Sequence, residues 1–177
     1  MTQKAYFNAT PKWIRNLLML IVLTSMPSLT SHAETPHEFV NRFVDFKYVF
    51  HEKIQEPGVF LSSRAGDCDD FATLADSVLR NSGYTPRLFA VRMKGETHVV
   101  CYIPEVGAYL DYNYRAEEDP LIATDGSVTD IAHKVAKSFG RSWHAAYEFT
   151  YQRRVKWLVD TIRFNKPNAK PFLVAAE

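Results

Sequence analysis

The fold is organised around residues 66–83, GDCDDFATLADSVLRNSG. Apolar residues recur there at helical spacing, which predicts a helix with one buried face. These residues are Phe71, Leu74, Ala75, Val78 and Leu79. Gly83 is typical of the left-handed residue that follows the end of a helix. Cys68 stands at the predicted helix start, where the helix dipole and free backbone N–H groups stabilise a thiolate.

Three aspartates, Asp67, Asp69 and Asp70, surround this cysteine. Negative charge is favourable at a helix start, but it opposes the formation of a thiolate on the neighbouring sulfur. A positively charged group is therefore needed beside Cys68, and an imidazolium is the usual partner.

After the helix, the pattern of apolar residues changes to the two-residue alternation of β-strands. Residues 88–93 and 97–103 predict two strands joined by a turn, and residues 109–112 predict a third strand that returns beside the second. Strand alternation places His98 on the face opposite Cys101. Asp111 is expected roughly opposite His98, so the sequence brings a histidine and an aspartate onto neighbouring strands.

The remaining elements are predicted from capping and turn signals. A capping box at Thr35 to Glu38 predicts a helix with a phenylalanine-rich buried face that ends before Pro57. A short loop is expected at 59–65. Further along, Ser127 or Thr129 caps a short helix that runs to Phe139. Residues 143–151 and 154–164 predict two final strands, although a helix is the alternative for the second.

Residues 1–33 predict a cleavable export signal. Basic residues precede a short apolar run at 17–23, and the small residues Ser31 and Ala33 predict cleavage after Ala33. The apolar run is shorter than the roughly 20 residues of a membrane span, although an uncleaved anchor is the alternative. We therefore expect a periplasmic or secreted protein without a stable membrane span.

One domain is expected at 34–164, with a flexible tail at 165–177. The chain of 177 residues is 46% hydrophobic, which is sufficient for one core. Its formal net charge is only +1, so the sequence lacks the excess of basic residues that is typical of nucleic-acid binding.

Cys68, His98 and Asp111 occur in the motifs GDCDDFATLADSVLRNSGYTPRLFAV, ETHVVCYI and AYLDYN, respectively. This pattern resembles the transglutaminase-like superfamily, and the export signal and small size resemble its bacterial, periplasmic cysteine proteinases. The resemblance implies an α+β fold with a papain-like core, in which the nucleophile helix packs on an antiparallel sheet. It also implies a catalytic triad of Cys68, His98 and Asp111.

In that triad Cys68 attacks an amide or ester carbonyl, His98 moves the proton, and Asp111 orients His98. The Cys68 backbone N–H supplies one donor to the oxyanion, and a side chain from residues 35–65 is expected to supply the second. The expected activity is hydrolysis of a protein or peptide substrate through a thioester, and it requires no cofactor. Protein-glutamine acyl transfer and a non-catalytic binding module are the alternatives.

A calcium site is a further expectation from the resemblance, because acidic residues that flank the cysteine ligate Ca²⁺ in relatives. Asp67 and Asp69 match those positions, with Asp70 as a helper, and carboxylate oxygens suit this ion. Ordinary helix-start acids are the alternative. The other mature histidines have no metal-ligand spacing and are expected on the surface or in packing: His37, His51, His133 and His144.

A disulfide between Cys68 and Cys101 is the competing interpretation of the two cysteines, because exported pairs are often bonded. His98 and Cys101 point to opposite faces of one strand. A Cys68 that meets His98 therefore cannot easily reach Cys101. We accordingly expect Cys101 to be a buried, unpaired residue.

Overall fold

The computed structural model describes residues 33–163. The predicted export signal, Ala33 apart, and the predicted tail at 165–177 lie outside these residues. The elements are α2 (Pro36–Asn41), β1 (Lys47–Tyr48), α3 (Pro57–Ser63), β2 (Ala65–Gly66), α4 (Cys68–Asn81), β3 (Arg87–Met93), β4 (Glu96–Ile103), η1 (Pro104–Val106), β5 (Ala108–Leu110), η2 (Tyr112–Tyr114), β6 (Leu121–Ala123), α5 (Val128–Ser138), β7 (Trp143–Gln152) and β8 (Val155–Arg163). Among residues 33–163, no helix combines the length and apolar character that a membrane crossing requires.

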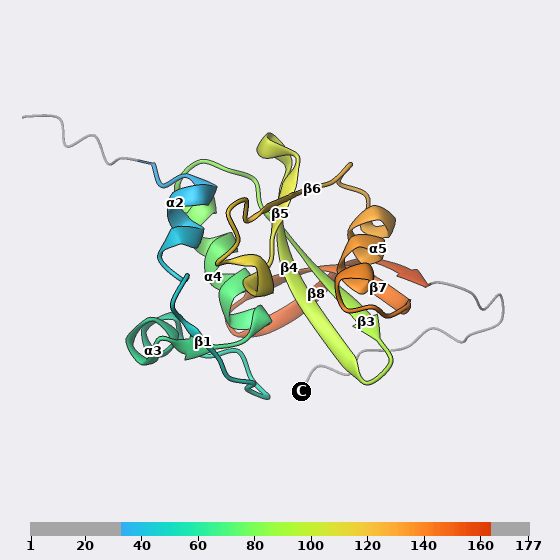
Figure 1. Ribbon diagram of the computed structural model, residues 1–177, viewed down its shortest axis with the longest axis horizontal. Coiled ribbons are helices and arrows are strands. Elements are labelled where there is room, and N and C mark those ends of the chain that lie inside the picture. The colour runs from blue at the N-terminus through green and yellow to red at the C-terminus, as the bar shows by residue number, and fades with distance from the viewer. Residues whose placement is uncertain (1–32, 164–177) are drawn as a thin grey trace, which may run out of the picture. The chain divides into compact units, whose positions relative to one another are not determined.

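An antiparallel sheet of six strands forms the centre, in the order β6-β5-β4-β3-β7-β8. Helices α2 and α4 lie on one side of this sheet and α5 lies on the other (Figure 1). Each side has its own core, one built around Phe71 and Cys101 and the other around Phe89 and Ile131. The predicted α+β class, with the cysteine helix packed on an antiparallel sheet, is confirmed.

Helix α4 begins and ends where the sequence predicts. Phe71, Leu74 and Leu79 are buried against the sheet, and Gly83 has a φ of +92° just after the helix. Gly66, two residues before the first residue of the helix, must be glycine because a side chain would not fit there. A Cβ at this position would lie 2.6 Å from both Asp70 Oδ2 and the Phe60 ring, which is too close for any larger residue.

The long helix predicted from Thr35 to Pro57 is wrong beyond Asn41. Its capping box forms, and Phe39 and Phe43 are buried, but Phe50 is 70% exposed. The chain leaves the helix because β1 pairs in parallel with β2, where the Lys47 N–H donates to the Arg64 carbonyl at 2.9 Å. Hydrogen bonds to a distant segment thus outweigh the local helical pattern.

The loop predicted at 59–65 is also wrong, because α3 occupies most of it. Pro57 is the first residue of this helix, a position that suits its fixed φ and missing N–H. The helix ends at Ser63, and Arg64 follows as its cap with a φ of +52°. The pair Pro57-Gly58, which predicts a turn from the sequence, instead begins a helix.

The second half follows the predicted order. Ser127 is the residue that caps α5, and its side chain accepts the Asp130 N–H. The final segment is a strand, β8, and not a helix. The short strand β6, which pairs with β5, was not predicted.

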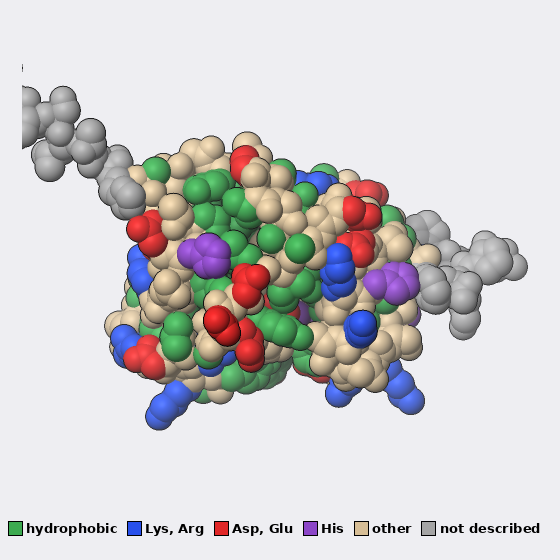
Figure 2. Space-filling view, turned by 45° about the horizontal axis from the view of Figure 1, so that its top comes forward, with side chains coloured by type: hydrophobic (Ala, Val, Ile, Leu, Met, Phe, Trp, Pro, Cys, Tyr) green, Lys and Arg blue, Asp and Glu red, His purple; other side chains and the backbone are tan. Residues whose placement is uncertain are grey.

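The two cysteines are both free thiols, so the disulfide interpretation is wrong. Cys101 is fully buried beneath α4, as expected for a small apolar residue. On the face drawn in Figure 2, the Lys and Arg side chains of the described residues are interspersed with Asp and Glu, and apolar side chains reach the surface between them.

Candidate active site

Cys68 is the first residue of α4 and is held by a capping box. The Asp67 side chain accepts the Asp69 N–H, and the Asp70 side chain accepts the Asp67 N–H at 3.1 Å. The Cys68 N–H belongs to the first turn, whose N–H groups have no partner within the helix. The residue is only 7% exposed, so its thiol lies in a largely desolvated position at the positive end of the helix dipole.

His98 and Asp111 form a buried hydrogen-bonded pair. Nε2 of His98 lies 2.8 Å from Oδ1 of Asp111, and the two side chains are 2% and 1% exposed. The same oxygen accepts the Asn113 backbone N–H at 2.8 Å, so the carboxylate is fixed from two directions. Its Oδ2 is buried and has no hydrogen-bond partner within residues 33–163.

Strand register explains how this pair forms. The pairing of β4 with β5 begins at Cys101, opposite Leu110, which is the last residue of β5. Asp111 was predicted inside the strand, but it lies one residue after it and caps η2. His98 therefore lies in the part of β4 that β5 leaves uncovered.

Cys68 lies near His98, and its sulfur helps to raise the pKa of the imidazole. Because Nε2 faces Asp111, Nδ1 is the ring nitrogen that remains for the sulfur. Burial, the largest single influence, lowers the pKa of His98, but the charge and hydrogen bond of Asp111 and the interaction with Cys68 raise the pKa above its ordinary value. A protonated imidazole in this position favours the thiolate. The structure thus brings together the three residues that the sequence selects.

Asp67 and Asp70 also hold the loop before the helix. Asp67 Oδ2 accepts the His51 N–H at 2.8 Å. Asp70 accepts the backbone N–H of Gln55 at 2.6 Å and its side-chain amide at 2.7 Å. Both aspartates are buried, and each carboxylate satisfies donors that would otherwise be costly to leave unpaired. These two acids therefore shape the loop at residues 49–56 as well as the helix start.

Asp69 differs from its neighbours. Its Oδ2 lies 3.1 Å from Lys156 Nζ, while its Oδ1 is buried without a hydrogen-bond partner in the described part of the chain. Burial, followed by the hydrogen bond with Asp67, raises the pKa of Asp69 to about 7, against the lowering effect of Lys156. An unpaired carboxylate oxygen next to Asp67 is compatible with a hard cation such as Ca²⁺.

A second group of possible ligands includes a histidine that sequence spacing did not single out. Among residues 33–163, ligand atoms of His51, Asp67 and Asp70 lie within 4.8 Å of one another. His51 Nδ1, however, is 2.9 Å from the Val49 carbonyl, and both carboxylates already accept N–H donors. This group is accounted for by hydrogen bonds that order the loop.

Tyr112 and Arg115, which no sequence motif singled out, join the Asp111 region to the N-terminal segment. The Tyr112 hydroxyl donates to the Lys47 carbonyl at 3.0 Å. Arg115 donates to the Phe43 carbonyl at 3.0 Å and stacks over Tyr112 at 3.9 Å from the ring centre. The available signal was the run of aromatic and basic residues directly after Asp111.

A cleft of about 670 Å³ opens beside Cys68. One wall contains Tyr48 and residues 50–52. Another, in the hairpin of β3 and β4, contains residues 92–93 and 95–97. Side chains of β7 and β8 complete the lining, among them Tyr147 and Lys156. Both aromatic and charged groups thus face a space next to the thiol that is large enough for part of an extended peptide.

A family model described as a transglutaminase-like domain matches residues 19–111. The matched region contains Cys68 and His98 and ends at Asp111. No curated protein matches the chain.

Proposed function

The chain belongs to the transglutaminase-like family, and we propose that it is an exported cysteine hydrolase that cleaves amide bonds in proteins or peptides. The observation that carries this proposal is the buried His98–Asp111 pair near Cys68, whose own side chain lines a cleft of peptide size. A structural histidine would need neither a buried carboxylate partner nor a thiol at a helix start.

The proposed reaction proceeds through a thioester. The Cys68 sulfur attacks the substrate carbonyl, and the electron pair of the C=O bond moves to the oxygen. The tetrahedral intermediate then collapses, and the departing amine takes a proton from His98. His98 next removes a proton from water, which attacks the thioester and releases the acid and the thiolate. Asp111 keeps His98 in one orientation throughout.

Mass spectrometry of an acyl-enzyme tests the proposal. The mature protein is incubated with a peptide library, and the reaction is stopped with acid at short times. We expect a mass increase on the peptide that contains Cys68, and free acid as the final product. If an amide is the dominant product when a primary amine is added, acyl transfer replaces hydrolysis as the proposed function. A protein that forms no adduct and leaves all peptides intact would reject the enzymatic proposal.

Export is proposed on the sequence of residues 1–33. Intact-mass analysis of protein from the native host is expected to give a chain that begins at Glu34, found outside the cytoplasm. A cytoplasmic chain that retains Met1 would contradict export, whereas a membrane-bound chain of full length would support the anchor.

Calcium binding is proposed on Asp67 and Asp69, where a bound ion would offset the acidic charge that opposes a thiolate at Cys68. Calorimetry of the mature protein with CaCl₂ is expected to give a binding isotherm that Asp69→Asn weakens at least tenfold. Asp119→Asn, which removes an exposed acid elsewhere, is the matched control. An absence of binding heat, together with activity unaffected by EGTA, would leave Asp67 and Asp69 as helix-start acids.

A further inference from the structure

Attack of Cys68 on a carbonyl creates a negative oxygen, which needs hydrogen-bond donors. This inference rests on the proposed function and concerns the donors of the same site. The Cys68 N–H, in the first turn of α4, is one donor. Acyl-transfer sites generally use at least two, so a second group on the cleft wall is required.

Few side-chain donors of the N-terminal segment line the cleft. Gln55 is not available, because its Nε2 donates to the Ala65 carbonyl at 3.1 Å and to Asp70 at 2.7 Å. Those that line the cleft are Tyr48 and His51. His51 contacts the Val49 carbonyl through Nδ1. Within the N-terminal segment, Tyr48 is therefore the cleft side chain with a fully uncommitted donor.

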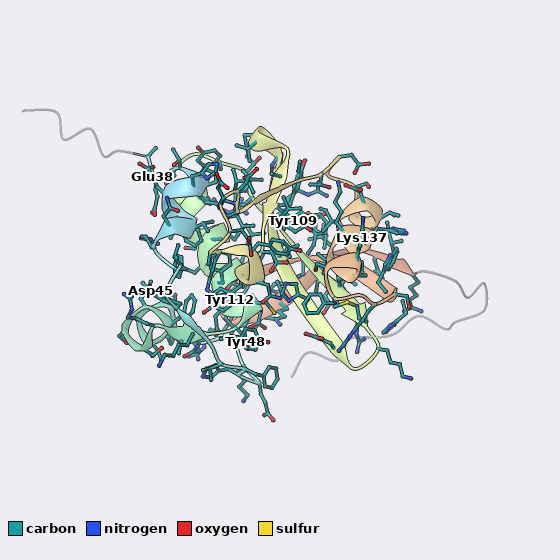
Figure 3. The ribbon with its side chains drawn as sticks, viewed as in Figure 1. Glu38, Asp45, Tyr48, Tyr109, Tyr112 and Lys137 are labelled. Atoms are coloured by element: carbon teal, nitrogen blue, oxygen red, sulfur yellow. The ribbon has the colours of Figure 1, made fainter. Side chains whose placement is uncertain are left out.

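The backbone fixes Tyr48 close to the nucleophile. Tyr48 in β1 pairs with Gly66 in β2, and Gly66 is only two residues before Cys68. The ring of Tyr48 packs beside that of buried Tyr112, with 6.2 Å between the centres, and Tyr112 in turn contacts Phe71 of α4. Figure 3 labels Tyr48 and Tyr112 near the start of α4. The aromatic contacts thus hold Tyr48 against the cysteine helix.

The hydroxyl of Tyr48 is uncommitted and stays protonated. Within residues 33–163 no group forms a hydrogen bond with it, and Tyr48 lines the cleft and is 50% exposed to solvent. Burial, followed by the negative charge of Cys68 and of the nearby acids, raises the pKa of Tyr48 to about 12. A phenol that remains neutral next to a thiolate is a donor for any oxyanion formed there.

We propose that the Tyr48 hydroxyl is the second oxyanion donor of this active site. When the sulfur adds to the carbonyl carbon, the oxygen gains the electron pair and accepts hydrogen bonds from the Cys68 N–H and the Tyr48 O–H. Tyr48 transfers no proton, and His98 remains the group that protonates the leaving amine. When the intermediate collapses, the C=O bond forms again and both hydrogen bonds weaken. Tyr48 is therefore catalytic through stabilisation of charge and not through acid–base chemistry.

The test uses Tyr48→Phe, which removes only the hydroxyl, in the mature protein. Removal of one oxyanion donor costs about 10²–10³ in kcat, and we expect this loss with little change in KM. Alkylation of Cys68 by iodoacetamide is expected at the wild-type rate, because it creates no oxyanion. Tyr84→Phe is the matched control, since Tyr84 packs outside the cleft, and it should retain full activity. His51→Gln tests the neighbouring donor and is expected to change kcat less than tenfold.

Three results would overturn the assignment. Full activity of Tyr48→Phe would remove Tyr48 as a donor, and a loss confined to His51→Gln would transfer the role to His51. In Tyr48→Phe, a rate of Cys68 alkylation that falls as far as kcat would show that Tyr48 supports the site and not the oxyanion. Cys68→Ala separates this inference from the proposed function. If Cys68→Ala is inactive and Tyr48→Phe is fully active, the hydrolase proposal stands and only the Tyr48 assignment fails.

Discussion

Replacement of Cys68 by alanine is expected to abolish hydrolysis, with a fall in kcat on the order of 10⁶, the loss found when the nucleophile of a serine triad is removed. The side chain is small and lies at the helix start, so Cys68→Ala should fold normally. Hydrolysis of the peptide identified by acyl-enzyme trapping measures the loss. Circular dichroism and the midpoint of urea unfolding check the fold.

Selective alkylation gives an independent measurement of the same thiol. Cys101 is fully buried, and its burial raises the pKa of its thiol well above the ordinary value. One iodoacetamide adduct per folded chain is therefore expected, and it should map to Cys68. Cys101→Ala is the matched control, which should keep its activity and its single adduct but lose about 1 kcal/mol of stability through the small cavity. Equal labelling of both cysteines, or activity in Cys68→Ala, would contradict the assignment of the nucleophile.

The second large effect is expected for Asp111→Asn, which should lower kcat by about 10²–10⁴ and leave the fold nearly intact. Loss of the orienting aspartate of a serine triad costs about 10⁴. The asparagine oxygen can still accept the Asn113 N–H. It carries no charge, however, and its amide end is free to face His98 and favour the wrong tautomer. His98→Ala is expected to lower kcat at least as much.

The pH–rate profile distinguishes this effect from a simple loss of structure. In the wild type, Asp111 raises the pKa of His98 against the lowering effect of burial. The charged pair therefore stabilises the folded site fully below the ordinary histidine pKa, and this contribution is lost as the pH rises through the raised value. In Asp111→Asn burial is no longer opposed by that charge, so the alkaline loss of activity should shift to lower pH.

Asp119→Asn, an exposed position, controls for the removal of one negative charge and should leave the profile unchanged. Full activity in Asp111→Asn would mean that another group orients His98. Asn113 would then be the nearest alternative, although its side chain is exposed. An unfolded Asp111→Asn protein would instead mean that the buried pair is required for the fold.

The sequence by itself determined the parts of the protein that depend on local pattern. The helical spacing of apolar residues in α4, its acidic start and Gly83 together specify a helix that begins at Cys68. Alternation along β4 places Cys101 in the core and His98 on the other face. The order of Cys68, His98 and Asp111 then indicated the family. These features are local because each is set by residues within one or two turns or along a single strand.

Only the tertiary structure decided how the N-terminal segment completes the site. Three interactions join residues that lie 15 to 72 positions apart. They are the pairing of β1 with β2, the hydrogen bond from the Gln55 N–H to Asp70, and the hydrogen bond from Arg115 to the Phe43 carbonyl. No local propensity encodes such bonds, and they interrupt a phenylalanine-rich stripe that has helical spacing. They matter because each satisfies donors or acceptors that folding removes from water. By holding the chain in this path, they place Tyr48 at the cleft beside Cys68.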